Sequence, residues 1–364
     1  MRKYLIVSLS TGGGHVTVAN SLAQGLEARG DEVLVVDLFK EINALGLHTF
    51  ICEGYNLIAT KAPKLYEGIY RAGNQPFIAK GSFDLTRRLS QKKILELVQS
   101  FQPEVIIAVH PIATDILGGM KRKGILAREK LVSVVTDYLA HFVYCHRHAY
   151  VDAYFVGGEV TRQDLLSRGV SPEKIHVHGI PIRHEFYSPG EKKPNERFTI
   201  LIMGGSMGSR NMTSVMRRLM AVPLPLSILA VCGRDEELKD KMDSFVGKDP
   251  SKNVTVFGFT KEVYRLMDQA DLLISKPGGA SVTKTLLRKV PMVIPYMLGG
   301  QEKENRDYLV REGAAIWAGN VRQITELVTG LIEEPQRLEV LRENMERIAR
   351  GFSVDAAIEA LRQI

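Results

Sequence analysis

Short apolar runs alternate with segments of helical periodicity along most of this chain, and that alternation constrains the fold more than any other feature. The pattern predicts parallel β-sheets flanked by helices. From residue 335 onward it is helical only, with Leu338, Leu341 and Met345 at helical spacing. The predicted strands cover residues 4–9, 33–36, 105–109, 132–135, 153–156, 200–203, 228–231, 254–257, 272–274 and 292–294.

The length of 364 residues exceeds what one typical hydrophobic core holds and fits two α/β domains. The least patterned stretch, residues 183–197, contains a polar Pro/Gly segment at 189–195, which is typical of a linker. We therefore predict an N-terminal domain of residues 1–188 and a C-terminal domain of residues 189–364.

Neither a membrane span nor a disulfide framework is expected. No apolar run approaches the roughly 18 residues that a spanning helix needs, and the apolar stretch near Met1 is too short for a signal peptide. The three cysteines, Cys52, Cys145 and Cys232, form no CxxC pair, which also argues against a zinc ribbon. We expect a cytoplasmic protein.

The formal net charge of +7 favours an anionic partner. Basic residues interleaved with aromatic ones concentrate between residues 61 and 93. Such a segment suits peripheral binding to an anionic membrane surface, and the alternative is an amphipathic helix packed on the N-terminal sheet with a solvated basic face. No nucleic-acid motif accompanies the charge, so nucleic acid is not expected. The residues predicted to contact the membrane are Tyr66, Tyr70, Phe77, Arg87 and Arg88.

A glycine-rich turn, Gly12-Gly13-Gly14-His15, follows the first predicted strand and precedes a helical segment. A turn of this kind points helix N–H groups at a ligand. Asp37, at the end of the second strand, lies where a ribose-binding acid would be, but Thr17 replaces the third glycine of the dinucleotide fingerprint. A nicotinamide-dependent dehydrogenase is therefore an alternative, ranked last because it leaves the second-domain motifs unexplained.

The second domain repeats the glycine-rich turn twice. One turn contains Gly204, Gly205 and Ser206, and the other runs from Lys276 to the Gly278-Gly279-Ala280-Ser281 segment. Two phosphate-binding helix N-termini in one domain suit a diphosphate. A later loop supplies amide and carboxylate groups, which hydrogen-bond sugar hydroxyls; its residues include Gln301, Glu302 and Asn305.

Taken together and in this order, the motifs resemble the MurG-like glycosyltransferases, in the branch of the bacterial diacylglycerol glucosyltransferases and the monogalactosyldiacylglycerol synthases. The resemblance covers nearly the whole chain. The matching segments are residues 12–15, 110–111, 135–138 with His141, 179–182, 203–206, 232–234, 258–260, 276–279 and 300–302 with Asn305.

This resemblance implies two Rossmann-like α/β domains of the GT-B type with an interdomain cleft. It implies inverting, metal-independent transfer of a hexose from a UDP-sugar to diacylglycerol or a related glycolipid, on the inner face of the cell membrane. The UDP-sugar is the donor substrate, and no cofactor is expected. The histidines His141, His146, His148, His176 and His178 are not expected to form a metal site, because no cysteine or carboxylate completes a ligand set.

Inverting transfer needs a base for the acceptor hydroxyl and N–H dipoles for the departing diphosphate. Asp137 and His15 are the predicted catalytic residues, with helix capping and a local backbone hydrogen bond as their respective structural alternatives. The resemblance assigns acceptor contacts to Gly13, Gly14, His141 and Tyr144. It assigns donor contacts to Gly205, Ser206, Gly233, Phe259, Thr260, Gly278, Gly279, Ala280, Ser281, Gln301 and Glu302.

Two positions depart from the family pattern. Lys284 replaces a glutamate that binds ribose hydroxyls in relatives, and a cation cannot accept those hydrogen bonds. Tyr144 replaces a tryptophan, which leaves an aromatic group in place. Two alternatives follow. One is a UDP-GlcNAc transferase acting on a lipid-linked cell-wall precursor, and the other is a UDP- or lipid-binding protein whose catalysis is weakened by Lys284.

Overall fold

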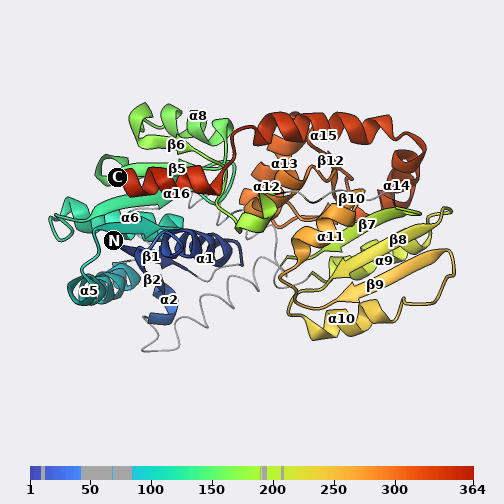
Figure 1. Ribbon diagram of the computed structural model, residues 1–364, viewed down its shortest axis with the longest axis horizontal. Coiled ribbons are helices and arrows are strands. Elements are labelled where there is room, and N and C mark those ends of the chain that lie inside the picture. Colours follow the sequence, from blue (N-terminus) through green and yellow to red (C-terminus); the bar gives the residue numbers. More distant parts are fainter. Residues whose placement is uncertain (10–12, 42–67, 69–83, 189, 191–194, 206–208) are drawn as a thin grey trace. The chain divides into compact units, whose positions relative to one another are not determined.

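The computed structural model describes residues 1–9, 13–41, 68, 84–188, 190, 195–205 and 209–364. Within these ranges, twelve strands form two six-stranded sheets in which all pairings are parallel (Figure 1). The first sheet has the order β2-β1-β3-β4-β5-β6, and the second has the order β12-β11-β10-β7-β8-β9. The predicted α/β class with two Rossmann-like domains is confirmed.

The chain divides into two compact units. The first comprises residues 1–184, 299–301 and 351–364, and the second comprises residues 185–298 and 302–350. The boundary thus lies four residues before the predicted one, and the last fourteen residues return to the first unit instead of completing the second.

The elements of the first unit are β1 (Lys3–Ser8), α1 (Gly13–Glu27), β2 (Glu32–Asp37), α2 (Leu38–Glu41), α5 (Asp84–Phe101), β3 (Val105–Ala108), α6 (Pro111–Arg122), β4 (Lys130–Val134), α7 (Phe142–Cys145), η1 (His148–Tyr150), β5 (Ala153–Val156), α8 (Glu159–Ser167), η2 (Pro172–Lys174), β6 (Ile175–Val177) and α16 (Val354–Gln363). The short helix η3 (His184–Phe186) spans the boundary between the units.

The elements of the second unit are β7 (Phe198–Met203), α9 (Asn211–Met220), β8 (Leu226–Val231), α10 (Glu236–Asp243), β9 (Lys252–Phe257), α11 (Val263–Gln269), β10 (Leu272–Ser275), α12 (Gly279–Arg288), β11 (Met292–Ile294), α13 (Gln301–Arg311), β12 (Ala315–Trp317), η4 (Val321–Gln323), α14 (Ile324–Glu333) and α15 (Gln336–Ala349).

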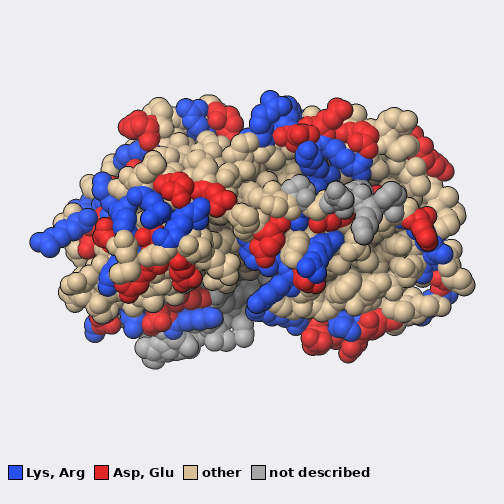
Figure 2. All heavy atoms as spheres, viewed as in Figure 1, with Lys and Arg blue, Asp and Glu red and all other residues tan. Residues whose placement is uncertain are grey.

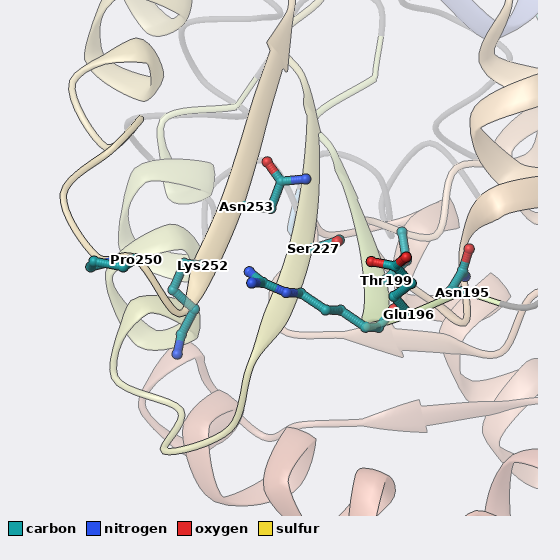
Figure 3. A pocket seen from close by; sticks show the side chains of 8 residues that line it. Asn195, Glu196, Thr199, Ser227, Pro250, Lys252 and Asn253 are labelled. Carbon is teal, nitrogen blue, oxygen red and sulfur yellow. Dashed lines mark hydrogen bonds between the residues drawn. The ribbon is translucent and has the colours of Figure 1, made fainter.

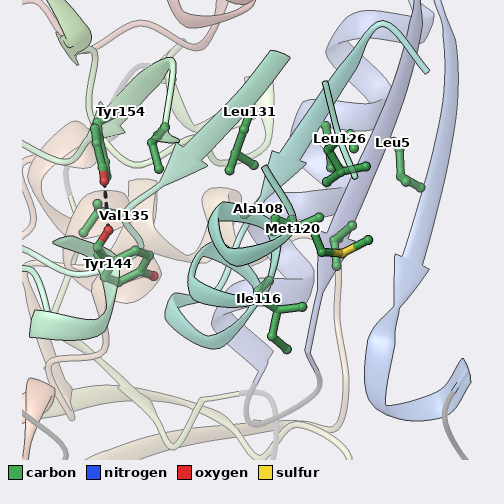
Figure 4. Close-up of a cluster of buried hydrophobic side chains, with 14 of the residues drawn as sticks. Leu5, Ala108, Ile116, Met120, Leu126, Leu131, Val135, Tyr144 and Tyr154 are labelled. Carbon is green, nitrogen blue, oxygen red and sulfur yellow. Dashed lines mark hydrogen bonds between the residues drawn. The ribbon is translucent and has the colours of Figure 1, made fainter. Parts of the chain in front are cut away.

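Each unit has its own hydrophobic core, as parallel sheets covered on both faces require. In the first unit, Leu5, Ala108 and Leu131 from three neighbouring strands pack with Ile116 and Met120 of α6 (Figure 4). In the second unit, apolar residues of the strands pack with those of the flanking helices, among them Ile200, Ile228, Val215, Leu219 and Val328.

The C-terminal helix α16 belongs to the first unit because its apolar face packs there. Val354, Ala357, Ile358 and Leu361 are buried. Gly25 of α1 allows the close approach, because a Cβ at this position would lie 2.9 Å from two side-chain carbons of Ile358. Arg29 adds ion pairs to Asp355 at 2.7 Å and to Glu359 at 2.6 Å. The helical spacing predicted this helix but not the surface it covers.

Candidate active site

The candidate acceptor site is at the carboxyl edge of the first sheet, where β1 lies between β2 and β3. Strand order reverses there, and α/β proteins bind ligands at such a switch point. His15 lies in the first turn of α1, and His110 follows β3. Their ring centroids are 4.5 Å apart, with the ring planes tilted by 59°.

The tautomer of His15 follows from its hydrogen bonds. Its Nδ1 lies 2.8 Å from the carbonyl oxygen of Val109. Since a carbonyl oxygen only accepts, Nδ1 carries the proton and Nε2 has the lone pair. The hydroxyl oxygen of Thr136 is also close, 3.0 Å from the same nitrogen. Burial lowers the pKa of His15 to about 4, against a smaller opposing effect of the Val109 hydrogen bond, so the imidazole is neutral at pH 7.

His110 has the opposite tautomer. It is the N-cap of α6, and its Nδ1 accepts a hydrogen bond from the Ile112 amide at 3.1 Å. A neutral ring that accepts at Nδ1 carries its proton on Nε2. Burial, with smaller contributions from His15 and His141, holds the pKa of His110 well below its ordinary value. The two neighbouring rings are therefore both neutral. His15 presents a hydrogen-bond acceptor at Nε2, whereas His110 presents a donor at Nε2.

Asp137 comes three residues after the end of β4 and is half-buried. It adjoins Thr136, whose hydroxyl oxygen lies 3.0 Å from His15 and 3.4 Å from the Tyr144 hydroxyl. Burial raises the pKa of Tyr144, and the Asp137 carboxylate contributes to the increase. The structure thus brings both predicted catalytic residues to one edge of the sheet.

The predicted acceptor residues have different surroundings. Gly13 and Gly14 begin α1, and a Cβ on Gly14 would meet no atom within 4 Å. His141 is the N-cap of α7, and its Nδ1 accepts from the Val143 amide at 3.2 Å. Tyr144 is a core residue, 2 % exposed, whose carbonyl accepts the Tyr154 hydroxyl at 2.9 Å (Figure 4). Its ring therefore packs in the hydrophobic core of the first unit and is not exposed to an acceptor.

The candidate donor site occupies the corresponding edge of the second sheet. Read from β9, the strands follow the 3-2-1-4-5-6 order of dinucleotide-binding folds, with the switch point between β7 and β10. Gly205 follows β7 with a φ of 82°, a conformation that favours glycine. Gly278 follows β10 as the N-cap of α12 and supplies no side-chain cap, while Gly279, Ala280 and Ser281 form the first turn of this helix. Ser206 lies outside the described residues.

The start of α13 contacts the glycine turn that follows β10. The side chain of Glu302 is buried; its Oε1 accepts from Lys276 Nζ at 2.8 Å, and its Oε2 accepts from the Leu298 amide at 2.7 Å. Asn305 donates from its side-chain amide to the Pro277 carbonyl at 3.0 Å. Gln301 is partly buried and begins α13. Glu302 and Asn305 thus hold the turn after β10 in place.

The predicted base-binding region lies after β8 and β9. Phe259 is 53 % exposed, and the guanidinium carbon of Arg234 lies 4.9 Å from its ring centroid. Gly233 has a φ of 69°. The Thr260 hydroxyl accepts from the Glu262 amide at 3.0 Å, so it stabilises the local turn. An exposed aromatic ring of this kind offers a stacking surface to a nucleobase.

Lys284 lies in the middle of α12 and is partly buried. Its Nζ is 5.1 Å from the ring centroid of Phe186, and the guanidinium carbon of Arg288 is 6.0 Å from the same centroid. Lys284, which replaces the glutamate expected from the resemblance, therefore makes a cation–π contact in this chain.

A polar hollow of about 540 Å³ lies at the opposite edge of the second sheet, at the amino-terminal ends of β7, β8 and β9 (Figure 3). Asn195, Arg197, Ser227, Lys252 and Asn253 are among its lining residues. The Lys252 ammonium donates to the Leu224 carbonyl and to the Ser251 hydroxyl, both at 2.9 Å. This hollow lies at the edge opposite the glycine turns, and none of the predicted site residues that the structure describes lines it.

Within the described parts of the chain, no group of three or more His, Cys, Asp or Glu residues is arranged to hold a metal ion. Nor does any helix described there have both the length and the apolar character needed to cross a membrane. Of the residues predicted to contact a membrane, Tyr66, Tyr70 and Phe77 lie outside the described residues, as do the side chains of Arg87 and Arg88.

Comparison with known proteins decides the family. Residues 15–182 match the monogalactosyldiacylglycerol (MGDG) synthase model, and residues 199–359 match the glycosyltransferase family 28 C-terminal domain. The chain is a glycosyltransferase of the MGDG synthase and family 28 type. It is 26 % identical over 370 residues to a processive diacylglycerol beta-glucosyltransferase of Bacillus pumilus, an alignment that covers 98 % of this chain and 94 % of the relative.

Solved structures of this glycosyltransferase fold agree. Acinetobacter baumannii MurG superposes with a TM-score of 0.69 at 15 % identity, with full coverage of both chains. Anabaena Alr3699/HepE in complex with UDP-glucose superposes with a TM-score of 0.58 at 16 % identity, again with full coverage of both chains. At these identities the superpositions establish the GT-B fold alone.

Three residues of the candidate sites were not predicted as site residues. His110 and Thr136 follow predicted strands directly, so their place at the carboxyl edge was readable, but their contacts with His15 join segments far apart in sequence. Tyr296 follows β11 and hydrogen-bonds Ser209 in the turn after β7; burial raises its pKa to about 12. A lone tyrosine after a short strand gave no signal of this contact.

Proposed function

We propose that this glycosyltransferase moves a hexose from a UDP-sugar to diacylglycerol or a related glycolipid, with inversion at the anomeric carbon. The observation that carries the proposal is the pair of glycine turns, at Gly205 and Gly278, that follow adjacent strands at the switch point of the second sheet. Amides at such turns and the N-terminus of α12 suit a diphosphate. The diacylglycerol specificity of the curated relatives supports the acceptor.

The chemistry needs one base and stabilisation of one leaving group. The Asp137 carboxylate takes the proton of the acceptor hydroxyl as that oxygen bonds the anomeric carbon. The bond between this carbon and the β-phosphate oxygen breaks, and UDP leaves with the electron pair. Before attack, the single hydroxyl hydrogen of the acceptor donates to the Nε2 lone pair of neutral His15, which orients the oxygen, and the same hydrogen then passes to the Asp137 carboxylate. The amides at Gly205 and at the start of α12 stabilise the charge on the leaving diphosphate.

For the donor, we propose the contacts that the family resemblance predicts. Phe259 stacks on uracil beside Gly233 and Thr260, while Gly205, Ser206, Gly278, Gly279, Ala280 and Ser281 surround the diphosphate. Gln301 and Glu302 accept hydroxyl hydrogens of the hexose. No metal or other cofactor takes part, since helix N-termini offset the phosphate charge.

The enzyme works as a peripheral protein on the anionic inner face of the cell membrane, where its lipid acceptor is found. On the face shown in Figure 2, basic and acidic side chains are interspersed over the described parts of both units. The attraction to anionic lipids is assigned to the segment between residues 61 and 93, because bases outnumber acids there.

A UDP-release assay tests this proposal. Purified protein is incubated with diacylglycerol vesicles and, separately, UDP-glucose, UDP-galactose and UDP-GlcNAc, with and without EDTA. UDP release that depends on diacylglycerol and persists in EDTA supports the proposal. Release only with UDP-GlcNAc and a lipid-linked cell-wall precursor would overturn the acceptor assignment. UDP binding without turnover on any acceptor would indicate a binding protein.

A further inference from the structure

The side chain of Lys276 runs between the two glycine turns of the second unit. It starts in the turn after β10, and its Cε lies 3.3 Å from the position that a Cβ on Gly205 would occupy. Its Nζ ends 2.8 Å from Glu302 Oε1. A Cβ on Gly278 would lie 3.9 Å from the same carboxylate oxygen. The ammonium and the carboxylate are therefore both beside the backbone proposed to bind the diphosphate.

Glu302 is the fixed member of this ion pair. Its Oε2 is held by the Leu298 amide at 2.7 Å, and the side chain is buried at the start of α13. One turn further along this helix, Asn305 donates to the Pro277 carbonyl at 3.0 Å, which ties α13 to the turn after β10. The position of Oε1 is thus set by contacts that do not involve Lys276.

Lys276 is the adjustable member. Its side chain retains 26 % of its exposure, and a lysine ammonium on a four-carbon stem redirects its three donors easily. Diphosphate and carboxylate are both strong partners for an ammonium. The Lys276 side chain passes beside Gly205, so its ammonium can reach either the Glu302 carboxylate or a diphosphate bound at the turn.

We propose that Lys276 is a positioning residue for which the donor diphosphate and Glu302 compete. When the diphosphate attracts the ammonium, Oε1 of Glu302 becomes available to accept a hexose hydroxyl. Occupancy of the diphosphate subsite therefore prepares the hexose subsite. This inference rests on the proposed function, because it takes a UDP-sugar as the donor.

Glu302→Gln provides the decisive variant. Its side-chain oxygen still accepts from the Leu298 amide, but the negative charge that holds Lys276 is gone. We expect calorimetric titration with UDP to show binding about three- to tenfold tighter than in the parent protein. The reason is that the Lys276 ammonium no longer has to break an ion pair with a carboxylate before it can bind the diphosphate. The kcat/KM for the UDP-hexose should fall in the same variant, since a hexose contact is lost.

Two controls separate this competition from a general charge effect. In Glu304→Gln, an acid of the same helix is neutralised, and UDP affinity should stay within about twofold of the parent. In a Lys276→Met background, where UDP binds more weakly, Glu302→Gln should no longer tighten UDP binding. A double-mutant cycle of this kind isolates the interaction between the two residues.

Unchanged or weaker UDP binding in Glu302→Gln would overturn the competition. So would tightening equal to that of Glu304→Gln, or tightening that persists without Lys276. These readouts need no lipid acceptor. Failure of the parent protein to bind UDP would instead contradict the proposed function itself, so the two failures are distinguishable.

Discussion

The Nδ1 atom of His15 lies 2.8 Å from the carbonyl oxygen of Val109, which fixes the proton on Nδ1 and leaves the lone pair on Nε2. The backbone hydrogen bond that was the structural alternative for His15 is therefore present, and it is also what presents a defined Nε2 edge. The structural and catalytic interpretations of this residue are compatible.

The pKa of about 4 for His15 predicts the acid side of the pH profile. Above that pH the ring is neutral and Nε2 accepts; below it, protonation of Nε2 removes the lone pair. We expect kcat/KM to be constant from pH 8 down to about pH 5 and to fall only as the pH approaches 4. Steady-state kinetics across this range, with His15→Gln as the control, provide the test. A decrease centred near the ordinary histidine value of 6.5 would contradict the account.

Thr136 connects His15 with Tyr144 through its hydroxyl. Thr136→Val keeps the shape of the side chain and removes that hydroxyl, so we expect kcat/KM to fall by about three- to tenfold with a smaller change in KM. Thr161→Val is the matched control, because the buried Thr161 hydroxyl donates to the Tyr138 carbonyl at 2.9 Å. Equal losses of activity in both variants would show that Thr136 has only a structural role.

The cation–π contact of Lys284 predicts the behaviour of Lys284→Met. Loss of the contact with Phe186 should lower the free energy of unfolding by about 0.5–1 kcal/mol. UDP affinity should stay within about twofold, because the ammonium is directed at the ring. Urea unfolding and calorimetry measure the two quantities, with the exposed Lys289→Met as the control. A large loss of UDP affinity would instead assign Lys284 to the nucleotide site.

The close approach of α1 and α16 predicts a stability effect at Gly25. In Gly25→Ala the new Cβ would lie 2.9 Å from the Ile358 side chain. We expect this crowding to outweigh the gain of about 1 kcal/mol from alanine in a helix and to lower the free energy of unfolding by about 1 kcal/mol. In an Ile358→Ala background the same substitution should cost much less, since the side-chain carbons that it meets are gone. Thermal unfolding of the parent protein, the two single variants and the double variant gives the coupling free energy between positions 25 and 358. Equal costs in the two backgrounds would show that the helices adjust without this contact.

The fold was predictable because each strand in the two sheets is encoded locally by a short apolar run. All ten predicted strands are present, with ends shifted by at most two residues. The ten did not include β6 and β12, which have three residues each and contain His176 and Trp317 in place of a continuous aliphatic run. Both are edge strands, and pairing with the neighbouring strand compensates for their weak local signal.

The candidate sites were predictable only in part. The residues after strand ends, such as Asp137 and Gly278, could be placed from sequence because parallel strands share a carboxyl edge. Contacts between distant segments could not, including those of His15 with Thr136 and of Lys276 with Glu302. Periodicity specifies which face of an element is buried, but it does not specify which polar side chains meet.

The most direct test of the central claim is identification of the lipid product. Protein, diacylglycerol vesicles and an α-linked UDP-hexose are incubated together, and the extracted lipids are analysed by mass spectrometry and proton NMR. The account predicts a hexosyl diacylglycerol with a β-anomeric linkage, reduced by about 100-fold or more in Asp137→Asn. An α-linked product, or equal product from Asp137→Asn, would contradict the mechanism. Absence of any glycosylated diacylglycerol with UDP-glucose, UDP-galactose and UDP-GlcNAc alike would contradict the assigned acceptor.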